Sequence, residues 1–314
     1  MKKNFGNFTR RQTLAALAGA SAAALSQARV ADNAAEGLAP PSVGAAQTRS
    51  ASGAYYACAL QFRVDAVNRD TSTAAARARM QASITRIDQQ LRGAKSWIGA
   101  DLKLVVLPEY TLTGFPTRES IPEWIDKAVL TIDGPEYTAL AAIAQKNAVF
   151  LAGSSYEADP KFPGIFFQCA WVIDPAGKVV LRYRRLISTL VPTPHDVWDA
   201  YLDAYGIDGV FPVARTPIGN LAAIASEEIL YPEIARCHAV RGAEVFLHSS
   251  SEAYTVTMPT KRIGRLARAM ENLAWVVSTN SAGVDNIDIP LDSANGGSEI
   301  IDHLGSTVVA AGQG

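Results

Sequence analysis

Short apolar runs alternate with longer amphipathic segments from residue 55 to the end of the chain. The runs at 104–107, 148–152, 221–225, 243–247 and 275–278 are typical of strands that a sheet buries on both faces. A further strand is predicted at 55–64. The segments 74–91, 134–146, 232–241 and 260–272 carry helix-forming residues at helical spacing and predict helices. Two pairs of alternating segments, 170–173 with 179–183 and 299–301 with 307–309, predict hairpins.

The segment 219–252 contains a strand, a polar turn, a helix and a second strand in one unbroken run. Ser226 ends the first apolar run, Pro232 suits the first turn of the following helix, and Gly242 ends the helical pattern. A unit of this length is a parallel βαβ crossover, and ligands bind at the carboxyl ends of the strands in such sheets. Ser226 is therefore expected at a chemically useful position.

The order of predicted elements occurs twice. Strand, helix, strand, helix, strand and hairpin follow one another from 55 to 185 and again from 221 to 312. This repeat predicts two sheets packed face to face with helices outside, an α/β fold organised as a four-layer α-β-β-α sandwich. We expect the folded domain to span residues 54–314.

The amino-terminal segment differs from the rest of the chain. Arg10 and Arg11 precede an uncharged, Ala-rich run that is too short for a transmembrane helix. This pattern resembles a twin-arginine export signal, and Ala28 offers a cleavage site before an Ala-, Ser- and Pro-rich tether at 29–53. The signal predicts a periplasmic or secreted protein without a membrane anchor after processing. An amphipathic amino-terminal helix is the alternative interpretation.

Composition and charge exclude several classes of protein. The chain has 314 residues, 48% of them hydrophobic, and a formal net charge of −1, so it has no basic field that would bind nucleic acid. Its 3 cysteines all lie in apolar surroundings, and an odd number in a chain bound for an oxidising compartment argues against a disulfide framework. Cys237 lies in the helix after Ser226, where core packing and a role as a displaced nucleophile are both conceivable. The 4 histidines show no metal-ligand spacing, and neither a metal nor another cofactor is expected.

Three motifs resemble those of the nitrilase superfamily of carbon-nitrogen hydrolases. They are Leu107-Pro108-Glu109-Tyr110, Tyr183-Arg184-Arg185, and Ser226-Glu227-Glu228 with Tyr231-Pro232-Glu233 after it. The resemblance covers nearly all of the chain from residue 55, and the superfamily has the four-layer fold. It implies a small amide or nitrile substrate and a homo-oligomer. Because members usually continue past the last hairpin, a carboxyl-terminal tail is expected to be missing after Gly314.

The resemblance also implies a role for individual residues. Glu109 matches the general base, Arg185 occupies the position of the catalytic lysine, and Ser226 occupies that of the nucleophilic cysteine. The backbone amide of Glu227 corresponds to an oxyanion donor. The substrate-binding candidates are Tyr110 and Asp196.

The chemistry of these side chains leaves alternatives open. Desolvation at a strand end would raise the pKa of Glu109 into the range of a base, although a capping or surface glutamate would give the same local pattern. Arg185 can supply charge but cannot give up a proton, and it could equally be a solvent-facing strand end. A serine hydroxyl needs a stronger base than a thiol does. His248 is the one histidine that could complete a triad with Ser226.

Three hypotheses follow. The first is a hydrolase of amide or nitrile bonds that uses Glu109, Arg185 and Ser226. The second is a catalytically impaired member that binds small amides, amines or carboxylates outside the cytoplasm. The third is an engineered Cys-to-Ser variant of an active enzyme, against which Arg185 argues, because one engineered change would not also replace the lysine.

Overall fold

The computed structural model describes residues 53–253 and 260–313. One sheet contains five strands in the order β1-β3-β4-β5-β6, and a second contains six in the order β13-β12-β10-β9-β8-β7. The strands of the first sheet are β1 (Tyr56–Ala59), β3 (Leu102–Val106), β4 (Phe150–Ala158), β5 (Phe166–Ile173) and β6 (Val179–Arg184). Those of the second are β7 (Ala214–Thr216), β8 (Gly219–Ala225), β9 (Val245–Ser250), β10 (Trp275–Asn280), β12 (Glu299–Ile301) and β13 (Thr307–Ala310).

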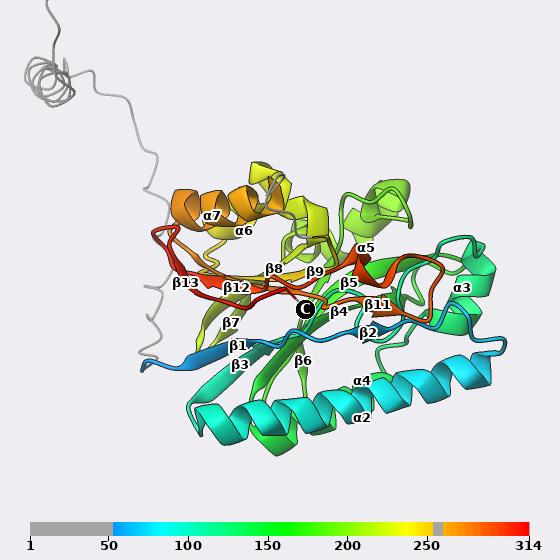
Figure 1. The fold of residues 1–314 in the computed structure, drawn as a ribbon. Coiled ribbons are helices and arrows are strands. Elements are labelled where there is room, and N and C mark those ends of the chain that lie inside the picture. The colour runs from blue at the N-terminus through cyan, green and yellow to red at the C-terminus, as the bar shows by residue number, and fades with distance from the viewer. Residues whose placement is uncertain (1–52, 254–259, 314) are drawn as a thin grey trace, which may run out of the picture. The chain divides into compact units, whose positions relative to one another are not determined.

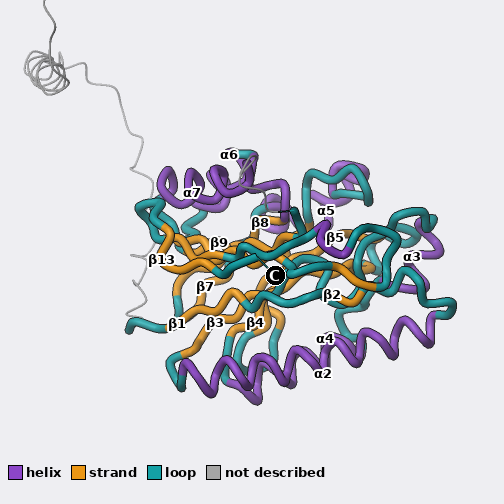
Figure 2. Tube along the Cα trace, in the orientation of Figure 1, coloured by secondary structure: helices purple, strands orange, loops and turns teal. Residues whose placement is uncertain are grey.

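Helices connect most of the parallel strands. They are α2 (Thr73–Ile98), α3 (Ile121–Ala128), α4 (Pro135–Asn147), α5 (Trp198–Val210), α6 (Pro232–Val240) and α7 (Thr260–Asn272), with short 3-10 turns η1 (Pro194–Val197), η2 (Ser226–Leu230) and η3 (Leu291–Ser293). Figure 1 shows α2 and α4 on one side of the strands and α6 and α7 on the other, and Figure 2 shows the same strands in orange between purple helices. The predicted α/β fold is confirmed.

The strand pairing follows the internal repeat expected from the sequence. In the first sheet β1, β3 and β4 run parallel, and β5 and β6 then follow antiparallel. In the second sheet β8, β9 and β10 run parallel, and β12 and β13 then follow antiparallel. The carboxyl ends of β3 and β8 are therefore equivalent positions in the two halves, and each is followed by a candidate catalytic residue.

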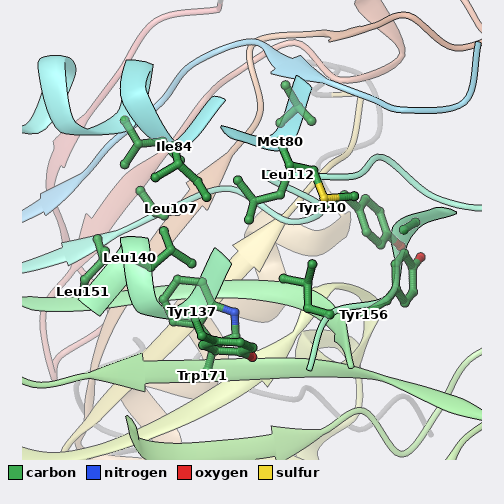
Figure 3. Close-up of a cluster of buried hydrophobic side chains, with 14 of the residues drawn as sticks. Met80, Ile84, Leu107, Tyr110, Leu112, Tyr137, Leu140, Leu151, Tyr156 and Trp171 are labelled. Carbon is green, nitrogen blue, oxygen red and sulfur yellow. The ribbon is translucent and has the colours of Figure 1, made fainter. Parts of the chain in front are cut away.

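Two hydrophobic clusters hold the layers together. The first lies between the five-stranded sheet and its helices, where Met80 and Ile84 of α2 pack near Leu140 and Trp171 (Figure 3). The second contains residues of both sheets, among them Val106, Leu221, Phe246 and Val276, and all four are fully buried. Hydrogen bonds also join the sheets, since the hydroxyls of Ser249 and Thr279 donate to the carbonyls of Leu107 and Val106 at 2.8 and 3.0 Å.

Helix α2 is longer than its sequence pattern predicted. The side chain of Ser72 accepts a hydrogen bond from the Ala75 amide at its start, and the helix continues to Ile98 rather than to residue 91. It ends at Gly99, whose φ of 98° suits a residue without a side chain. The apolar pattern fades after Leu91 because the last two turns of the helix are largely exposed.

Other elements differ from their sequence-based predictions. The expected strand at 55–64 is two strands, because the chain leaves the first sheet after Ala59 and forms β2 (Val64–Asp65), which pairs with β11 (Val284–Asp285). Helices α3 and α5 lie in segments for which the sequence pattern predicts no element. No helix in the described residues is long and apolar enough to span a membrane.

Candidate functional site

Glu109 is a buried carboxylate that lies just after β3. Its side chain is 1% exposed, and its backbone amide donates to the carbonyl of Ser250 in the other sheet at 3.2 Å. Gln168 Nε2 donates to Glu109 Oε1 at 2.6 Å, and Arg185 Nη1 lies 3.4 Å from the same oxygen. Burial raises the pKa of Glu109 above its ordinary value, although the charge of Arg185 opposes the rise. The geometry suits a group that accepts a proton.

Arg185 is fixed beside Glu109 by several acceptors. Its Nη1 also donates to Gln168 Oε1 at 2.9 Å, and its Nε donates to the carbonyl of Ile187 at 2.6 Å. Its Nη2 donates to the carboxylate of Glu227. Burial opposes the charge of this guanidinium, but Glu109 and the other neighbouring acids raise its pKa above the ordinary value. Arg185 is therefore a cation whose planar head is held in one orientation.

Ser226 lies at the junction of β8 and η2 with an unusual backbone conformation. Its φ is 47°, and the residue is 1% exposed. Residues other than glycine rarely adopt this left-handed backbone conformation. The backbone strain that it causes persists only where the surrounding structure enforces it. The turn places Ser226 and the backbone amide of Glu227 at the carboxyl end of β8, where sequence analysis expected them.

Glu228 holds this turn against the segment that contains Arg185. One of its carboxylate oxygens accepts from the amides of Leu186 and Ile187 at 2.7 and 3.1 Å, and the other accepts from the hydroxyl of Tyr183 at 2.7 Å and from the Ala225 amide at 3.2 Å. Burial raises the pKa of Glu228 to about 7, against the hydrogen bond from Tyr183. Through these bonds the β8 turn and the end of β6 form one unit.

The side chain of Glu227 points back to the same site. It bridges Arg185 and Lys261, whose Nζ lies 3.0 Å from Glu227 Oε1. Burial alone would raise the pKa of Glu227, but the charges of Lys261 and Arg185 outweigh it and lower the pKa to about 2. Glu227 is thus an anion between two cations. Its pKa is lowered, whereas the pKa of Glu109 is raised.

His248 is close to Ser226 but bonds to its backbone. His248 Nε2 lies 2.9 Å from the carbonyl oxygen of Ser226, and Nδ1 lies 2.8 Å from Ser278 Oγ. Because a carbonyl accepts, Nε2 carries the proton and Nδ1 accepts from Ser278. Burial, followed by the charge of Arg265, lowers the pKa of His248 to about 3. In this arrangement a neutral imidazole holds the turn, and neither ring nitrogen is available to the Ser226 hydroxyl.

The remaining candidates lie in different surroundings. Tyr110 is buried beside Glu109 with a φ of 57°, and its ring packs on Phe115 and Tyr156 with centroids 5.2 and 5.7 Å apart. Asp196 is exposed, and its carboxylate accepts from the amide and hydroxyl of Thr193 at 2.7 and 3.1 Å. Among the described residues Tyr110 therefore adjoins the Glu109 site, whereas Asp196 caps η1.

Comparisons with known proteins identify the family. The family model for carbon-nitrogen hydrolases matches residues 66–314. The chain belongs to the carbon-nitrogen hydrolase family. A formamidase from Bacillus cereus (strain B4264) is 30% identical over 213 residues, which are 67% of this chain and 59% of that protein. The chain thus spans less than two thirds of the length of the curated relatives it matches.

Solved structures show the same fold. A carbon-nitrogen hydrolase from Helicobacter pylori G27 superimposes with a TM-score of 0.62 at 21% identity, over 82% of this chain and 85% of that one. An amidase from Nesterenkonia sp. superimposes with a TM-score of 0.58 at 19% identity, over 81% of this chain and 86% of that one. These matches support a nitrilase-superfamily fold for this member of the carbon-nitrogen hydrolase family.

Sequence analysis of this carbon-nitrogen hydrolase missed two residues of the Glu109 site. Gln168 lies two residues before the predicted strand 170–173, which pairs with the strand that leads to Arg185, so its place opposite Arg185 was in principle detectable. Lys261 comes from the first turn of α7, and nothing in the local sequence distinguishes it from other basic residues of that helix. Cys237, the suggested alternative nucleophile, is a half-buried free cysteine of α6.

Proposed function

We propose that this carbon-nitrogen hydrolase cleaves the amide or nitrile bond of a small substrate with Glu109 as base, Ser226 as nucleophile and Arg185 as cation. One observation carries the proposal: Glu109 lies against Arg185, and Arg185 lies against the residue that follows Ser226. Residues 109, 185 and 227 are far apart in sequence, yet the fold joins Glu109 to Arg185, and Arg185 to Glu227 next to Ser226, through direct contacts. The formamidase and amidase relatives support a small amide as substrate.

The reaction on an amide would proceed in two steps. Glu109 takes the proton of the Ser226 hydroxyl while the oxygen attacks the carbonyl carbon, and the Glu227 amide and the charge of Arg185 stabilise the oxyanion. Glu109 then gives its proton to the leaving nitrogen, so that ammonia departs and an ester on Ser226 remains. Glu109 then takes a proton from water, whose oxygen attacks the ester carbon, and returns this proton to the Ser226 oxygen as the ester bond breaks, so that the acid leaves and the hydroxyl is restored.

Slow turnover is expected from this site. A hydroxyl is far more difficult to deprotonate than a thiol, and a carboxylate is a weak base even with a raised pKa. Arg185 is also held by four contacts, which limits its movement toward an oxyanion. These observations favour the second candidate, a catalytically impaired member that binds small amides, amines or carboxylates.

The two candidates are separated by comparing variants of the purified protein. Ammonia release from short amides and nitriles is measured for the wild type, Ser226→Cys, and Ser226→Cys with Arg185→Lys, with Ser226→Ala as the blank. We expect slow or undetectable release by the wild type, some by the thiol variant, and more by the double variant, with non-additive gains because the residues act together.

Two outcomes would contradict this expectation. If the wild type is as fast as Ser226→Cys, serine is a competent nucleophile and the impaired alternative fails. If neither variant releases ammonia while the wild type binds an amide in a calorimetric titration, the binding protein is favoured.

The place of action and the assembly are part of the proposal. Arg10 and Arg11 with the apolar run after them support export to the periplasm or the medium in a folded state. The family resemblance supports a homo-oligomer.

A further inference from the structure

Lys261 brings a second, half-buried cation to the Glu109 site. Its Nζ lies 3.0 Å from Glu227 Oε1 and 3.0 Å from Glu252 Oε2, and its side chain is 14% exposed. Burial opposes its charge, but Glu252, Glu227 and Glu109 outweigh burial and raise the pKa of Lys261. A lysine held charged at this depth between two acids is not an ordinary surface residue.

Lys261 is linked to Glu109 by alternating charges. Lys261 contacts Glu227, Glu227 contacts Arg185, and Arg185 contacts Glu109. These four residues come from four separate segments: α7, η2, the end of β6 and the end of β3. Each residue in this series is paired with one of opposite charge. Loss of the charge of Lys261 is therefore expected to affect Glu109 through Glu227 and Arg185.

A second series of ion pairs holds Lys261 through Glu252. Glu252 also accepts from Arg265 Nη1 at 2.9 Å, and Arg265 Nε donates to Glu299 Oε1 at 2.7 Å. Arg265 is 1% exposed, and Glu299 is 2% exposed. Arg262, the next residue of α7, pairs with Glu299 from the outer side, with its Nε 3.3 Å from Glu299 Oε2, and is not one of the groups that contact Glu227 or Glu252. The charged groups that face Lys261 are therefore Glu227, Glu252, Glu109, Arg185 and Arg265.

We propose that Lys261 is a positioning residue of the catalytic site: through Glu227 it holds Arg185 against Glu109, and its charge favours the ionised form of Glu109. The charge balance explains why two cations are present. Glu227 lies between Arg185 and Lys261, and its negative charge alone would disfavour ionisation of Glu109. Lys261 neutralises Glu227 and leaves the charge of Arg185 free to act on Glu109. That this positioning serves catalysis rests on the proposed function. The effect of Lys261 on the ionisation of Glu109 does not depend on it.

The test compares three variants by a measurement that needs no turnover. The pKa of Glu109 is followed by the ¹³C shift of its carboxyl carbon in glutamate-labelled protein, and Glu109→Gln assigns the signal. Lys261→Met removes the charge, and Lys261→Arg retains it. Arg262→Met is the matched control, since it removes an ion pair of the adjacent residue in the same helix, and the partners of Arg262 are Glu299 and Thr307 rather than Glu227 or Glu252.

We expect the pKa of Glu109 to rise by about one unit in Lys261→Met, which is the usual size of the effect of one nearby charge. It should change little in Lys261→Arg and in Arg262→Met. Lys261→Gln serves the same purpose if the methionine variant does not fold. An unchanged Glu109 pKa in the charge-removing variant, or an equal rise in Arg262→Met, overturns the proposal.

A second readout uses the pH profile of amide hydrolysis by Ser226→Cys. The acidic limb of kcat/KM should move to higher pH when Lys261→Met is added, and Lys261→Arg should restore it. If the carboxyl pKa moves as expected but no variant releases ammonia, the positioning role stands and the proposed hydrolase function fails. If ammonia is released but neither the carboxyl pKa nor the limb moves, the hydrolase stands and the role of Lys261 is wrong.

Discussion

Glu109 is held between burial, which favours its protonated form, and Arg185 with Lys261, which favour the carboxylate. At the scale of single residues, this balance is the main chemical property of the site. Burial is the larger effect, so the pKa is raised and the group can exchange protons in a useful pH range. Glu227 has the opposite balance and stays ionised, with a pKa of about 2. Two adjoining acids are thereby given different roles by their surroundings.

The first prediction concerns Glu109 as the base. In Ser226→Cys, the added change Glu109→Gln should lower kcat by about 10²- to 10⁴-fold, the usual contribution of a general base. Since the carboxylate is the active form, the rate with Glu109 intact should fall as pH drops through its raised pKa. The measurement is kcat/KM for a short amide against pH. An acidic limb that persists in Glu109→Gln would assign the titration to another group.

At the scale of elements, β4 and β5 pack without space for an added methyl group. A Cβ built on Gly153 of β4 would lie 2.7 Å from Trp171 Cζ2 of β5. Trp171 is 1% exposed, and its Nε1 donates to Ser155 Oγ at 3.1 Å, so the ring is held in place. The antiparallel pair that carries Gln168 and leads to Arg185 depends on this contact.

The second prediction tests this packing. Gly153→Ala should lower the free energy of unfolding by about 1 to 3 kcal/mol, the usual cost of overpacking a core. Gly93→Ala is the control: it lies on the exposed side of α2 with no atom within 4 Å of the added Cβ, and it should stabilise by about 0.5 to 1 kcal/mol. Urea unfolding of both variants and the wild type measures these free energies. Equal stability of Gly153→Ala and wild type would mean that Trp171 can move.

The third prediction concerns the amino-terminal segment, which lies outside the described residues. Replacing Arg10 and Arg11 by lysine should leave precursor inside the cell, because a twin-arginine signal is read as a pair of arginines. Fractionation of cells that express the two versions measures this, with a cytoplasmic marker as control. Normal export of the lysine version would argue against the twin-arginine signal.

At the scale of the whole molecule, buried titratable groups make stability depend on pH. His238 of α6 is fully buried between the rings of Tyr183 and Phe211, and burial lowers its pKa to about 4. A histidine with a depressed pKa stabilises the fold above its unfolded pKa of about 6.5, and this contribution is lost as pH falls toward 4. Glu228 acts in the opposite direction, because its raised pKa favours folding at low pH.

The fourth prediction isolates the histidine from these other groups. The difference in unfolding free energy between wild type and His238→Gln should shift by about 3 kcal/mol against the wild type between pH 7 and pH 4. The variant lacks the imidazole that must take up a proton on unfolding, so its own curve should be flatter. Chemical unfolding at several pH values measures both curves. Parallel curves would show that His238 is not the group responsible.

The hydrophobic pattern determined the α/β fold and the internal repeat, because each buried strand and amphipathic helix depends mostly on its own residues. It also placed Glu109 and Ser226 correctly at strand ends, since an apolar run ends where polar residues begin. The first strand and the length of α2 were predicted wrongly, because a break in pairing and an exposed helix end leave little trace in the pattern.

Only the tertiary structure decided which side chains meet. Gln168 is 59 residues from Glu109, Arg185 is 76 residues from Glu109, and Lys261 is 34 residues from Glu227, so no local pattern relates them. The fold also placed His248 on the backbone of Ser226, although its chemistry suited another role. Residue types state which charges a chain can offer, whereas burial and the packing of distant strand ends decide which charges face each other and how each one titrates.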